Sequence, residues 1–255
     1  MNYLTRILDE KKSEVSKLKS SNPRGALADA ELQPTRSFAD AIRRKPGDPL
    51  RLIAEIKKAS PSRGVMVEDF KPVEIATLYH QQGAAAFSVL TDEPFFKGHI
   101  NDLKAVRAAL PLPVLRKDFI IDESQLYESR LIGADAVLLI AAALAPSQLA
   151  EYLHLARELE LDVLTEIHDE HELEIAIDAD APIIGINNRN LKDFSVDIET
   201  SVRLRTRIPQ GFTAVSESGL KTKEAIMKAD AASFDAVLIG EGLIGAENLY
   251  EWKSL

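Results

Sequence analysis

The sequence predicts an α/β protein in which eight strands and eight helices alternate to form a (β/α)8 TIM barrel. Apolar runs typical of buried strands begin near Leu52, Ala86, Val114, Ala136, Asp162, Ile183, Thr213 and Ala236. Amphipathic stretches separate the runs, and each separation of about 20–35 residues accommodates one strand, one helix and two short loops. Eight such units are the number found in a TIM barrel.

The predicted strands are apolar almost throughout, as Ala136–Ile140 illustrates, which is typical of strands that are covered on both faces. An open, doubly wound sheet is the alternative fold. Such a sheet seldom needs eight strands, and a Gly-rich phosphate loop would follow its first strand. Residues Lys57–Gly64 follow the first strand here and lack that glycine pattern, so the sequence favours the barrel.

Several predicted helices have start signals. Pro72 fits the first position of a helix, and Ser124 and Thr222 fit N-caps. Pro146 opens a helix over Ser147–Leu159. Each signal places a helix after a predicted strand, as an alternating fold requires.

A leader segment precedes the first barrel strand. Apolar residues at helical spacings among charged ones predict an amphipathic helix over residues 3–18. A stretch that contains Ser, Pro and Arg follows it, with a short helix at Phe38–Ile42. We expect residues 1–48 to form an N-terminal helical extension of a single domain that spans residues 1–255.

Composition and net charge argue against several classes of partner and active site. The 255 residues are 45% hydrophobic and 28% charged, with 40 acidic against 31 basic residues and a net charge of -9. This balance argues against a nucleic-acid or anionic-membrane partner, since both select for basic surfaces. There is no cysteine, which excludes disulfides, thiolate metal sites and cysteine nucleophiles. Without a secretory signal or a membrane-spanning run, we expect a cytoplasmic protein, and a monomer by default.

Four of the apolar runs end in ionisable residues, although an unpaired buried charge costs several kcal/mol or more. The endings are Glu55-Ile56-Lys57, Arg116-Lys117-Asp118, Glu166 and Ser216-Glu217-Ser218. In a TIM barrel the carboxyl ends of the strands meet on one face, which carries the active site. The pattern therefore predicts a shared polar pocket there, to which Asn187, Asn188 and Arg189 also contribute.

The spacing of Glu55 and Lys57 refines this prediction. Residues two apart on a strand project to the same side, so these two face the pocket while Ile56 faces the helices. Lysines and glutamates that converge in a dry cavity shift one another's pKa, which allows a general acid and a general base to coexist. An ion-pair layer that merely plugs the barrel is the alternative, and for any single pair it is equally well supported. The whole set favours function.

Small residues predict a phosphate site after the last two strands. Ser218-Gly219 and Gly240-Glu241-Gly242 lie where barrels commonly bind phosphate. Either glycine alone is more simply a loop residue. The Glu241 carboxylate would repel phosphate, so we expect it to point away and leave its N–H as the donor.

The remaining candidates have weaker support. His168 follows a strand, where a solvated loop position is the simpler interpretation, and no histidine has metal-ligand spacing, so no metal is predicted. Phe96 and Phe119 follow the second and third predicted strands and could form walls for an aromatic substrate.

Six segments closely resemble the indole-3-glycerol phosphate synthase family. They are Ile53–Ser62, Ser88–Asp92, Val114–Ile120, Ile184–Arg189, Val215–Gly219 and Leu238–Glu241. The resemblance covers nearly the whole chain, including the helix that this family adds before its barrel. Ile167 and Asn190 depart from the residues expected there, Val and Asp, at positions marginal to the site.

The resemblance implies ring closure of 1-(2-carboxyphenylamino)-1-deoxyribulose 5-phosphate, with loss of carbon dioxide and water, in tryptophan biosynthesis. It implies that Lys117 is the acid at the C2′ oxygen, that Glu166 is its acid/base partner in dehydration, and that Lys57 neutralises the substrate carboxylate. By the same resemblance, the groups that orient the reactants would be Glu55, Asn187, Glu217 and Ser218. The phosphate would be bound by Gly219, Gly240 and the Glu241 backbone, and Ser60 would lie in the loop that closes over the substrate. The aromatic ring would be contacted by Phe96, Phe119 and Leu138, with Arg189 nearby. This chemistry needs no cofactor.

Three other functions are open to such a barrel. A phosphoribosylanthranilate isomerase is disfavoured because that family typically uses a cysteine. A Schiff-base aldolase would use Lys117 or Lys57 as a neutral nucleophile. A barrel that only binds a partner would not need four charged strand ends and should expose a large apolar patch.

Overall fold

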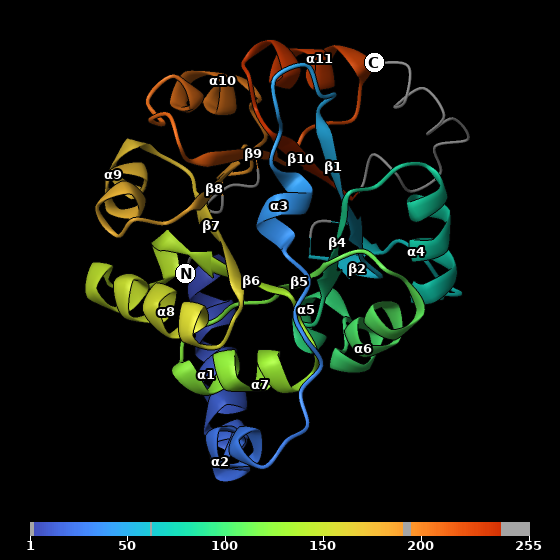
Figure 1. Ribbon diagram of the computed structural model, residues 1–255, viewed down its shortest axis with the longest axis vertical. Helices are drawn as coiled ribbons and strands as arrows, with labels where there is room; N and C mark the ends of the chain where they lie inside the picture. The colour runs from blue at the N-terminus through green and yellow to red at the C-terminus, as the bar shows by residue number, and fades with distance from the viewer. Residues whose placement is uncertain (1–2, 62, 191–194, 241–255) are drawn as a thin grey trace.

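A closed barrel of eight parallel strands forms the centre of the protein (Figure 1). The computed structural model describes residues 3–61, 63–190 and 195–240. The barrel strands are β1 (Arg51–Ile56), β4 (Ala86–Leu90), β5 (Val114–Lys117), β6 (Ala136–Ile140), β7 (Asp162–Ile167), β8 (Ile183–Asn187), β9 (Thr213–Glu217) and β10 (Ala236–Ile239). Each begins within one residue of its predicted start, and β1 pairs with both β4 and β10 to close the ring. The predicted TIM barrel is confirmed.

Helices surround the strands. They are α4 (Pro72–Gln81), α5 (Glu93–Phe96), α6 (Ile100–Ala109), α7 (Glu123–Leu131), α8 (Pro146–Glu158), α9 (Glu170–Asp178), α10 (Glu199–Arg205) and α11 (Lys223–Ala231), with a 3₁₀ turn η1 (Ala141–Ala143). Thr222 caps α11 by accepting a hydrogen bond from Ala225 N–H, as predicted. The predicted N-cap Ser124 is wrong. Asp122 lies in extended backbone before α7 and accepts from Ser124 N–H, so Ser124 lies inside the first turn.

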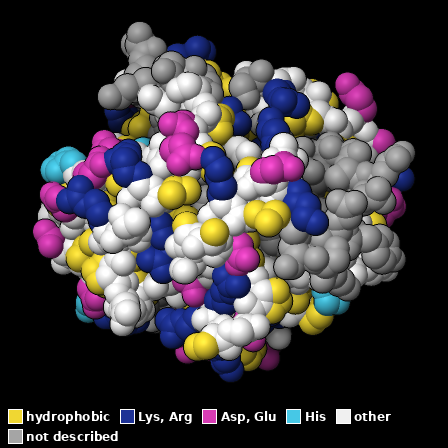
Figure 2. Space-filling model, turned by 90° about the horizontal axis from the view of Figure 1, so that it is seen from above, with side chains coloured by type: hydrophobic (Ala, Val, Ile, Leu, Met, Phe, Trp, Pro, Cys, Tyr) yellow, Lys and Arg dark blue, Asp and Glu magenta, His cyan; other side chains and the backbone are white. Residues whose placement is uncertain are grey.

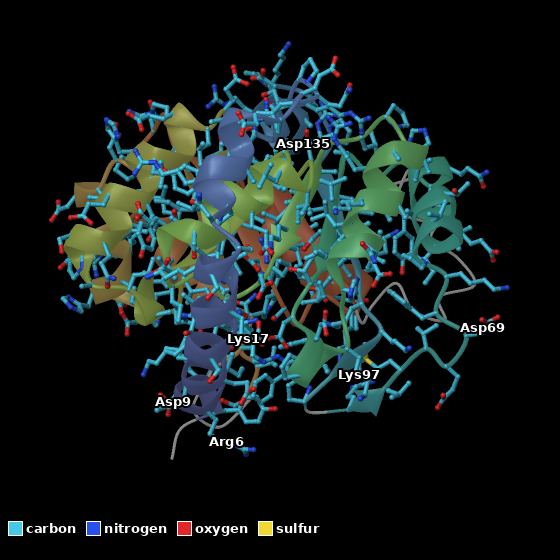
Figure 3. The ribbon with its side chains drawn as sticks, turned by 90° about the horizontal axis from the view of Figure 1, so that it is seen from below. Arg6, Asp9, Lys17, Asp69, Lys97 and Asp135 are labelled. Carbon is cyan, nitrogen blue, oxygen red and sulfur yellow. The ribbon has the colours of Figure 1, made fainter. Side chains whose placement is uncertain are left out.

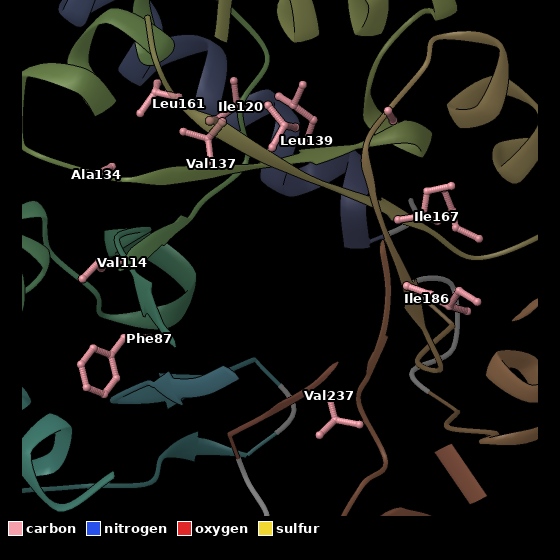
Figure 4. Close-up of a cluster of buried hydrophobic side chains, with 14 of the residues drawn as sticks. Phe87, Val114, Ile120, Ala134, Val137, Leu139, Leu161, Ile167, Ile186 and Val237 are labelled. Atoms are coloured by element: carbon pink, nitrogen blue, oxygen red, sulfur yellow. The ribbon is translucent and has the colours of Figure 1, made fainter. Parts of the chain in front are cut away.

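The apolar side chains form two layers. The outer layer lies between strands and helices and includes Ile56, which therefore faces the helices as predicted; Figure 4 shows part of this layer. The inner layer fills the barrel with Ile53, Leu115, Leu164 and other side chains. Strands covered on both sides explain why the sequence runs are continuously apolar rather than alternating.

The N-terminal extension contains three helices, α1 (Tyr3–Ser20), α2 (Pro23–Ala28) and α3 (Phe38–Ile42). The sequence predicted α1 and α3. It did not predict α2, which lies in the stretch that contains Ser, Pro and Arg, although Asn22 caps this helix and Pro23 begins it. It also did not predict the two-residue strands β2 (Ala59–Ser60) and β3 (Gly64–Val65), which pair as a small hairpin after β1.

Helix α3 closes the end of the barrel at which the strands begin. Phe38 and Ile42 are fully buried and pack into the inner layer of the barrel. Three aspartates at strand starts accept backbone N–H groups of this segment: Asp135 from Arg36 at 2.7 Å, Asp162 from Ala39 at 2.8 Å, and Asp235 from Arg44 at 3.1 Å. The Ala39 N–H is a donor of the first turn, which has no partner within the helix, and the Arg36 and Arg44 bonds fix the chain on either side of it.

Helix α1 runs along the side of the barrel to the end where the strands terminate, which is opposite to the end that α3 closes. In Figure 3, Arg6 and Asp9 of α1 lie toward the same end as Lys97, which follows α5, whereas Asp135 lies at the other end. Helix α1 packs against α7, and Lys19 near the C-terminal end of α1 pairs with Asp122 just before α7. The extension therefore contacts both ends of the barrel.

The surface carries mixed charge. On the face in Figure 2, Lys and Arg side chains are interspersed with Asp and Glu side chains rather than gathered into one basic patch. Within the described residues, every helix is too short or too polar to cross a membrane.

The plug formed by α3 predicts a large effect of truncating Phe38. Phe38→Ala should lower the free energy of unfolding by about 3–5 kcal/mol, because it leaves a cavity inside the barrel. Urea unfolding measures the change. Met227→Ala, at a side chain that is 54% exposed on α11, is the control and should change it by less than about 0.5 kcal/mol. A loss below about 1 kcal/mol for Phe38→Ala would contradict the plug.

Candidate active site

A cavity opens at the end of the barrel where the strands terminate. Two predictions are wrong: Arg116 contacts Gln125 and Ser129 of α7, and Asn188 contacts Ser201 of α10, so neither side chain lines the cavity. Glu241 lies outside the described residues. The other fourteen residues with an implied role line the cavity. These are Glu55, Lys57, Ser60, Phe96, Lys117, Phe119, Leu138, Glu166, Asn187, Arg189, Glu217, Ser218, Gly219 and Gly240. The first turns of α1 also line the cavity, through Tyr3, Leu4 and Ile7. Sequence reasoning missed this contribution because a helix period shows which face is buried but not what covers it.

A buried cluster of three charges lies in this cavity. The Lys117 Nζ is 2.6 Å from Glu217 Oε2 and 3.1 Å from Glu166 Oε2. The three residues come from β5, β7 and β9, and the two carboxyl side chains are almost fully buried. The Asn187 side chain adds a hydrogen bond to Glu166. Ionised groups can stay buried here because each one has partners.

Their pKa values move in different directions. Burial alone would lower the pKa of Lys117, but Glu217, Glu166 and Glu55 outweigh it and the pKa is raised. Burial would raise the pKa of Glu166, but Lys117 and His168 outweigh it and the pKa is lowered. Burial, together with repulsion from Glu166 and Glu55, outweighs the attraction of Lys117 and raises the pKa of Glu217 to about 7. A protonated lysine therefore lies beside an ionised carboxylate, which is the arrangement of a general acid and a base.

A second pair faces the same space. Lys57 Nζ forms an ion pair with Glu55 Oε1, so the period-2 prediction for this strand end is confirmed. A Cβ at Gly240 would collide with the Glu55 carboxylate, and one at Gly185 would collide with Glu217. These glycines leave the room that the two buried carboxylates occupy.

His168 belongs to the same cluster. The prediction of a solvated loop position is wrong, because only 14% of its side chain is exposed. Its Nδ1 is 3.0 Å from Glu172 and its Nε2 is 3.4 Å from Glu166. Burial would lower its pKa, but these two carboxylates outweigh it and the pKa is raised. The spacing of Glu166 and His168, which are two apart like Glu55 and Lys57, was the signal that could have located it.

Aromatic side chains form one wall of the cavity. The rings of Phe96 and Phe119 have centroids 6.1 Å apart and planes inclined by 35°. Leu138, from β6, also lines the cavity. This apolar wall can contact a flat aromatic ring.

The backbone after β9 is unusual at Ser218 and Gly219, whose φ angles are 64° and 79°. A Cβ at Gly219 would also lie 2.7 Å from Val196 Cγ1, so both the backbone angle and this contact favour glycine. The Asn188 side chain accepts Ser201 N–H and donates to the Ser218 carbonyl at 3.0 Å, which holds this turn in place. Strained backbone beside a cavity is a feature typical of ligand sites.

Comparison with known proteins agrees with this geometry. A model of the indole-3-glycerol phosphate synthase family matches residues 4–253. The chain belongs to this family. Proteins named indole-3-glycerol phosphate synthase from Chloroherpeton thalassium and Chlorobium phaeovibrioides are 57% and 58% identical to it, over 99% and 95% of each chain. The protein of that name from Chlorobaculum tepidum is 54% identical over 99% of each chain. The chain is thus an enzyme of tryptophan biosynthesis and a carboxy-lyase, as the motifs implied.

The raised pKa of Glu217 predicts a pH dependence of stability. Between about pH 4.5 and 7 the folded protein keeps a proton on Glu217 that the unfolded chain releases, so stability from this group falls as pH rises. Glu217→Gln abolishes this titration. The free energy of unfolding of the variant, minus that of the wild type, should therefore increase from about pH 5 to about pH 8 in denaturant titrations.

Glu158→Gln provides the control for this measurement, because Glu158 is an exposed glutamate on α8. Its difference from the wild type should stay nearly constant over the same range. A Glu217→Gln difference that is equally constant would show that Glu217 does not titrate in this window.

Proposed function

We propose that the protein closes the pyrrole ring of 1-(2-carboxyphenylamino)-1-deoxyribulose 5-phosphate to give indole-3-glycerol phosphate, and that Lys117 and Glu166 carry the proton transfers. The observation that supports these roles is the position of Lys117 Nζ, in contact with both Glu166 and Glu217 inside the barrel end. The substrate is a small molecule with an aromatic ring, a carboxylate and a phosphate, and the cavity has a surface suited to each.

The substrate can lie across the cavity in one orientation. The Phe96 and Phe119 rings and Leu138 form the apolar wall for the carboxyphenyl ring. Lys57 is the cation that we propose neutralises the ring carboxylate. Backbone N–H groups near Ser218, Gly219 and Gly240 would bind the phosphate, since small residues let the oxygens approach closely. We further propose that Ser60 lies in a loop that closes over the substrate and that Glu55, Asn187, Glu217 and Arg189 orient the reacting groups.

The chemistry begins with attack of the ring carbon that bears the carboxylate on the C2′ carbonyl carbon. Lys117 donates a proton to the C2′ oxygen as the new carbon–carbon bond forms, and loss of carbon dioxide restores the aromatic ring. Water then leaves from C2′ with a second proton, which the Lys57 ammonium can donate, while Glu166 accepts the proton from C1′. At neutral pH the raised pKa of Lys117 keeps its amine protonated and the lowered pKa of Glu166 keeps its carboxylate ionised, so each group is in the charge state that its proposed role needs.

The aldolase alternative needs a neutral lysine. The raised pKa of Lys117 keeps the amine protonated and therefore a poor nucleophile for a carbonyl carbon. We expect no borohydride-reducible adduct when ribulose 5-phosphate is added, as measured by mass spectrometry of the intact protein. A mass increase at Lys117 would favour the Schiff-base reaction instead.

We also propose that the enzyme acts as a monomer in the cytoplasm. The net charge of -9 favours solubility and mutual repulsion of copies. Among the described residues, the exposed large hydrophobic side chains Val65, Leu78, Val196 and Met227 lie on separate elements or loops. Light scattering coupled to gel filtration measures the mass directly, and a dimer mass would contradict the proposal.

The proposed roles predict that Lys117→Met and Glu166→Gln each lower kcat by about a hundredfold to ten-thousandfold, because each removes a proton-transfer group. The assay is the appearance of indole fluorescence after addition of the carboxyphenylamino deoxyribulose phosphate. Lys71→Met removes a half-exposed surface lysine at the start of α4 and should leave turnover unchanged. Near-normal turnover of folded Lys117→Met protein would overturn its assignment as the acid.

A further inference from the structure

A lysine is buried on the apolar face of α1. Leu4, Ile7 and Val15 are the buried apolar residues of this helix, and Lys11 takes the position between Ile7 and Val15 with only 2% of its surface exposed. Burying an ammonium group is costly, and an apolar residue could have packed there instead. The partners of this lysine therefore indicate what it does.

The Lys11 ammonium joins two buried aspartates that follow neighbouring strands. Its Nζ is 3.0 Å from Asp92 Oδ2, just beyond β4, and 3.0 Å from Asp118 Oδ1, just beyond β5. Glu14, one turn along α1, lies at 2.7 Å. Arg116 faces Asp118 from its other side at 3.2 Å. Burial would lower the pKa of Lys11, but Asp118, Asp92 and Glu14 outweigh it and the pKa is raised.

Each aspartate also holds the backbone of a phenylalanine that lines the cavity. Asp92 Oδ1 accepts the N–H groups of Phe95 and Phe96 at 2.9 and 3.2 Å, and so caps α5. Asp118 Oδ1 accepts the N–H group of Phe119 at 2.8 Å. The two phenylalanines are the pair whose rings lie 6.1 Å apart in the wall of the cavity.

We infer that Lys11 is a positioning residue: through Asp92 and Asp118 it sets the separation and tilt of the Phe96 and Phe119 rings, and thereby the affinity of the site for the aromatic end of its substrate. This inference rests on the proposed function for the identity of that aromatic end. A helix anchor alone would not require that both aspartates of the ion cluster bind the backbone N–H groups of the two ring-wall residues.

The test compares two inhibitors that differ in the ring. The ring probe is the borohydride-reduced substrate, 1-(2-carboxyphenylamino)-1-deoxypentitol 5-phosphate, and the ringless probe is ribulose 5-phosphate. For Lys11→Met we expect the dissociation constant of the ring probe to rise about tenfold while that of the ringless probe changes by less than about twofold. We also expect KM of the substrate to rise by a larger factor than kcat falls.

Lys12→Met is the matched control, because Lys12 is the next residue of the same helix and its side chain is 69% exposed. It should leave both dissociation constants unchanged. If Lys11→Met does not fold because Asp92 is left without its cation, the double variant Lys11→Met/Asp92→Asn removes the uncompensated charge and keeps a side chain that can cap α5. Its ring-probe affinity should still fall, by about threefold.

Equal weakening of both probes in a folded variant would overturn the inference, because it would indicate a general loosening of the cavity. Unchanged ring-probe affinity would overturn it too. Failure of the proposed function is a separate result, since it would appear as absence of indole formation by the wild-type protein.

Discussion

Electrostatic compensation inside the end of the barrel is the constraint on which the rest of the site depends. Lys117 contacts two buried carboxylates that come from different strands. Removing its ammonium group would leave both carboxylates in a low-dielectric space without this cationic partner. The parallel register fixes the geometry, because Glu217 lies opposite Asn187 and Glu166 lies opposite Gly185. Gly185 has no side chain, and a Cβ there would occupy the position of the Glu217 carboxylate. The strand register therefore determines the geometry of this charge cluster as much as the attraction between its charges does.

The N-terminal extension supports this arrangement from both ends of the barrel. At the strand starts, Phe38 fills the barrel interior while aspartates bind the backbone of its segment. At the strand ends, α1 covers part of the cavity and supplies the buried Lys11. The two contacts differ in kind, since the first is apolar packing and the second is an ion cluster. Apolar packing resists small displacements of side chains, but its attraction does not depend on their orientation. Charge-assisted hydrogen bonds, in contrast, hold particular donor and acceptor atoms in a fixed geometry. The ion cluster lies at the end where orientation matters to a substrate.

The sequence predicted the strands well because parallel barrel strands are apolar on both faces and therefore stand out as runs such as Ala136–Ile140. It predicted the Glu55–Lys57 pair because a period of 2 is built into strand geometry. Lys11 was missed because a lysine on a helix is usually solvated. Its two aspartate partners lie about 80 and 107 residues away in the chain, so the neighbouring sequence does not identify them. His168 was missed because it follows the last residue of β7, where a solvated loop is the simpler interpretation, although the period of 2 from Glu166 continues to it. Local patterns thus predict the elements, while long-range charge pairing has to be seen in the fold.

The charges that line the cavity connect its acid–base state to the binding of an anion. Lys57, Lys117, Arg189 and Lys221 contribute four positive charges, and Glu55, Asp118, Glu166 and Glu217 contribute four negative charges when all are ionised. The pKa of Asp118 is lowered to about 2, because Arg116 and Lys11 outweigh its burial, so it stays charged. Glu217, with its pKa near neutrality, is the carboxylate that can take up a proton most easily. Protonation there gives the cavity a net positive charge, and a substrate with a carboxylate and a phosphate would favour that state. Binding and proton uptake would then be linked, and the substrate itself would help to set the protonation pattern that its own chemistry requires.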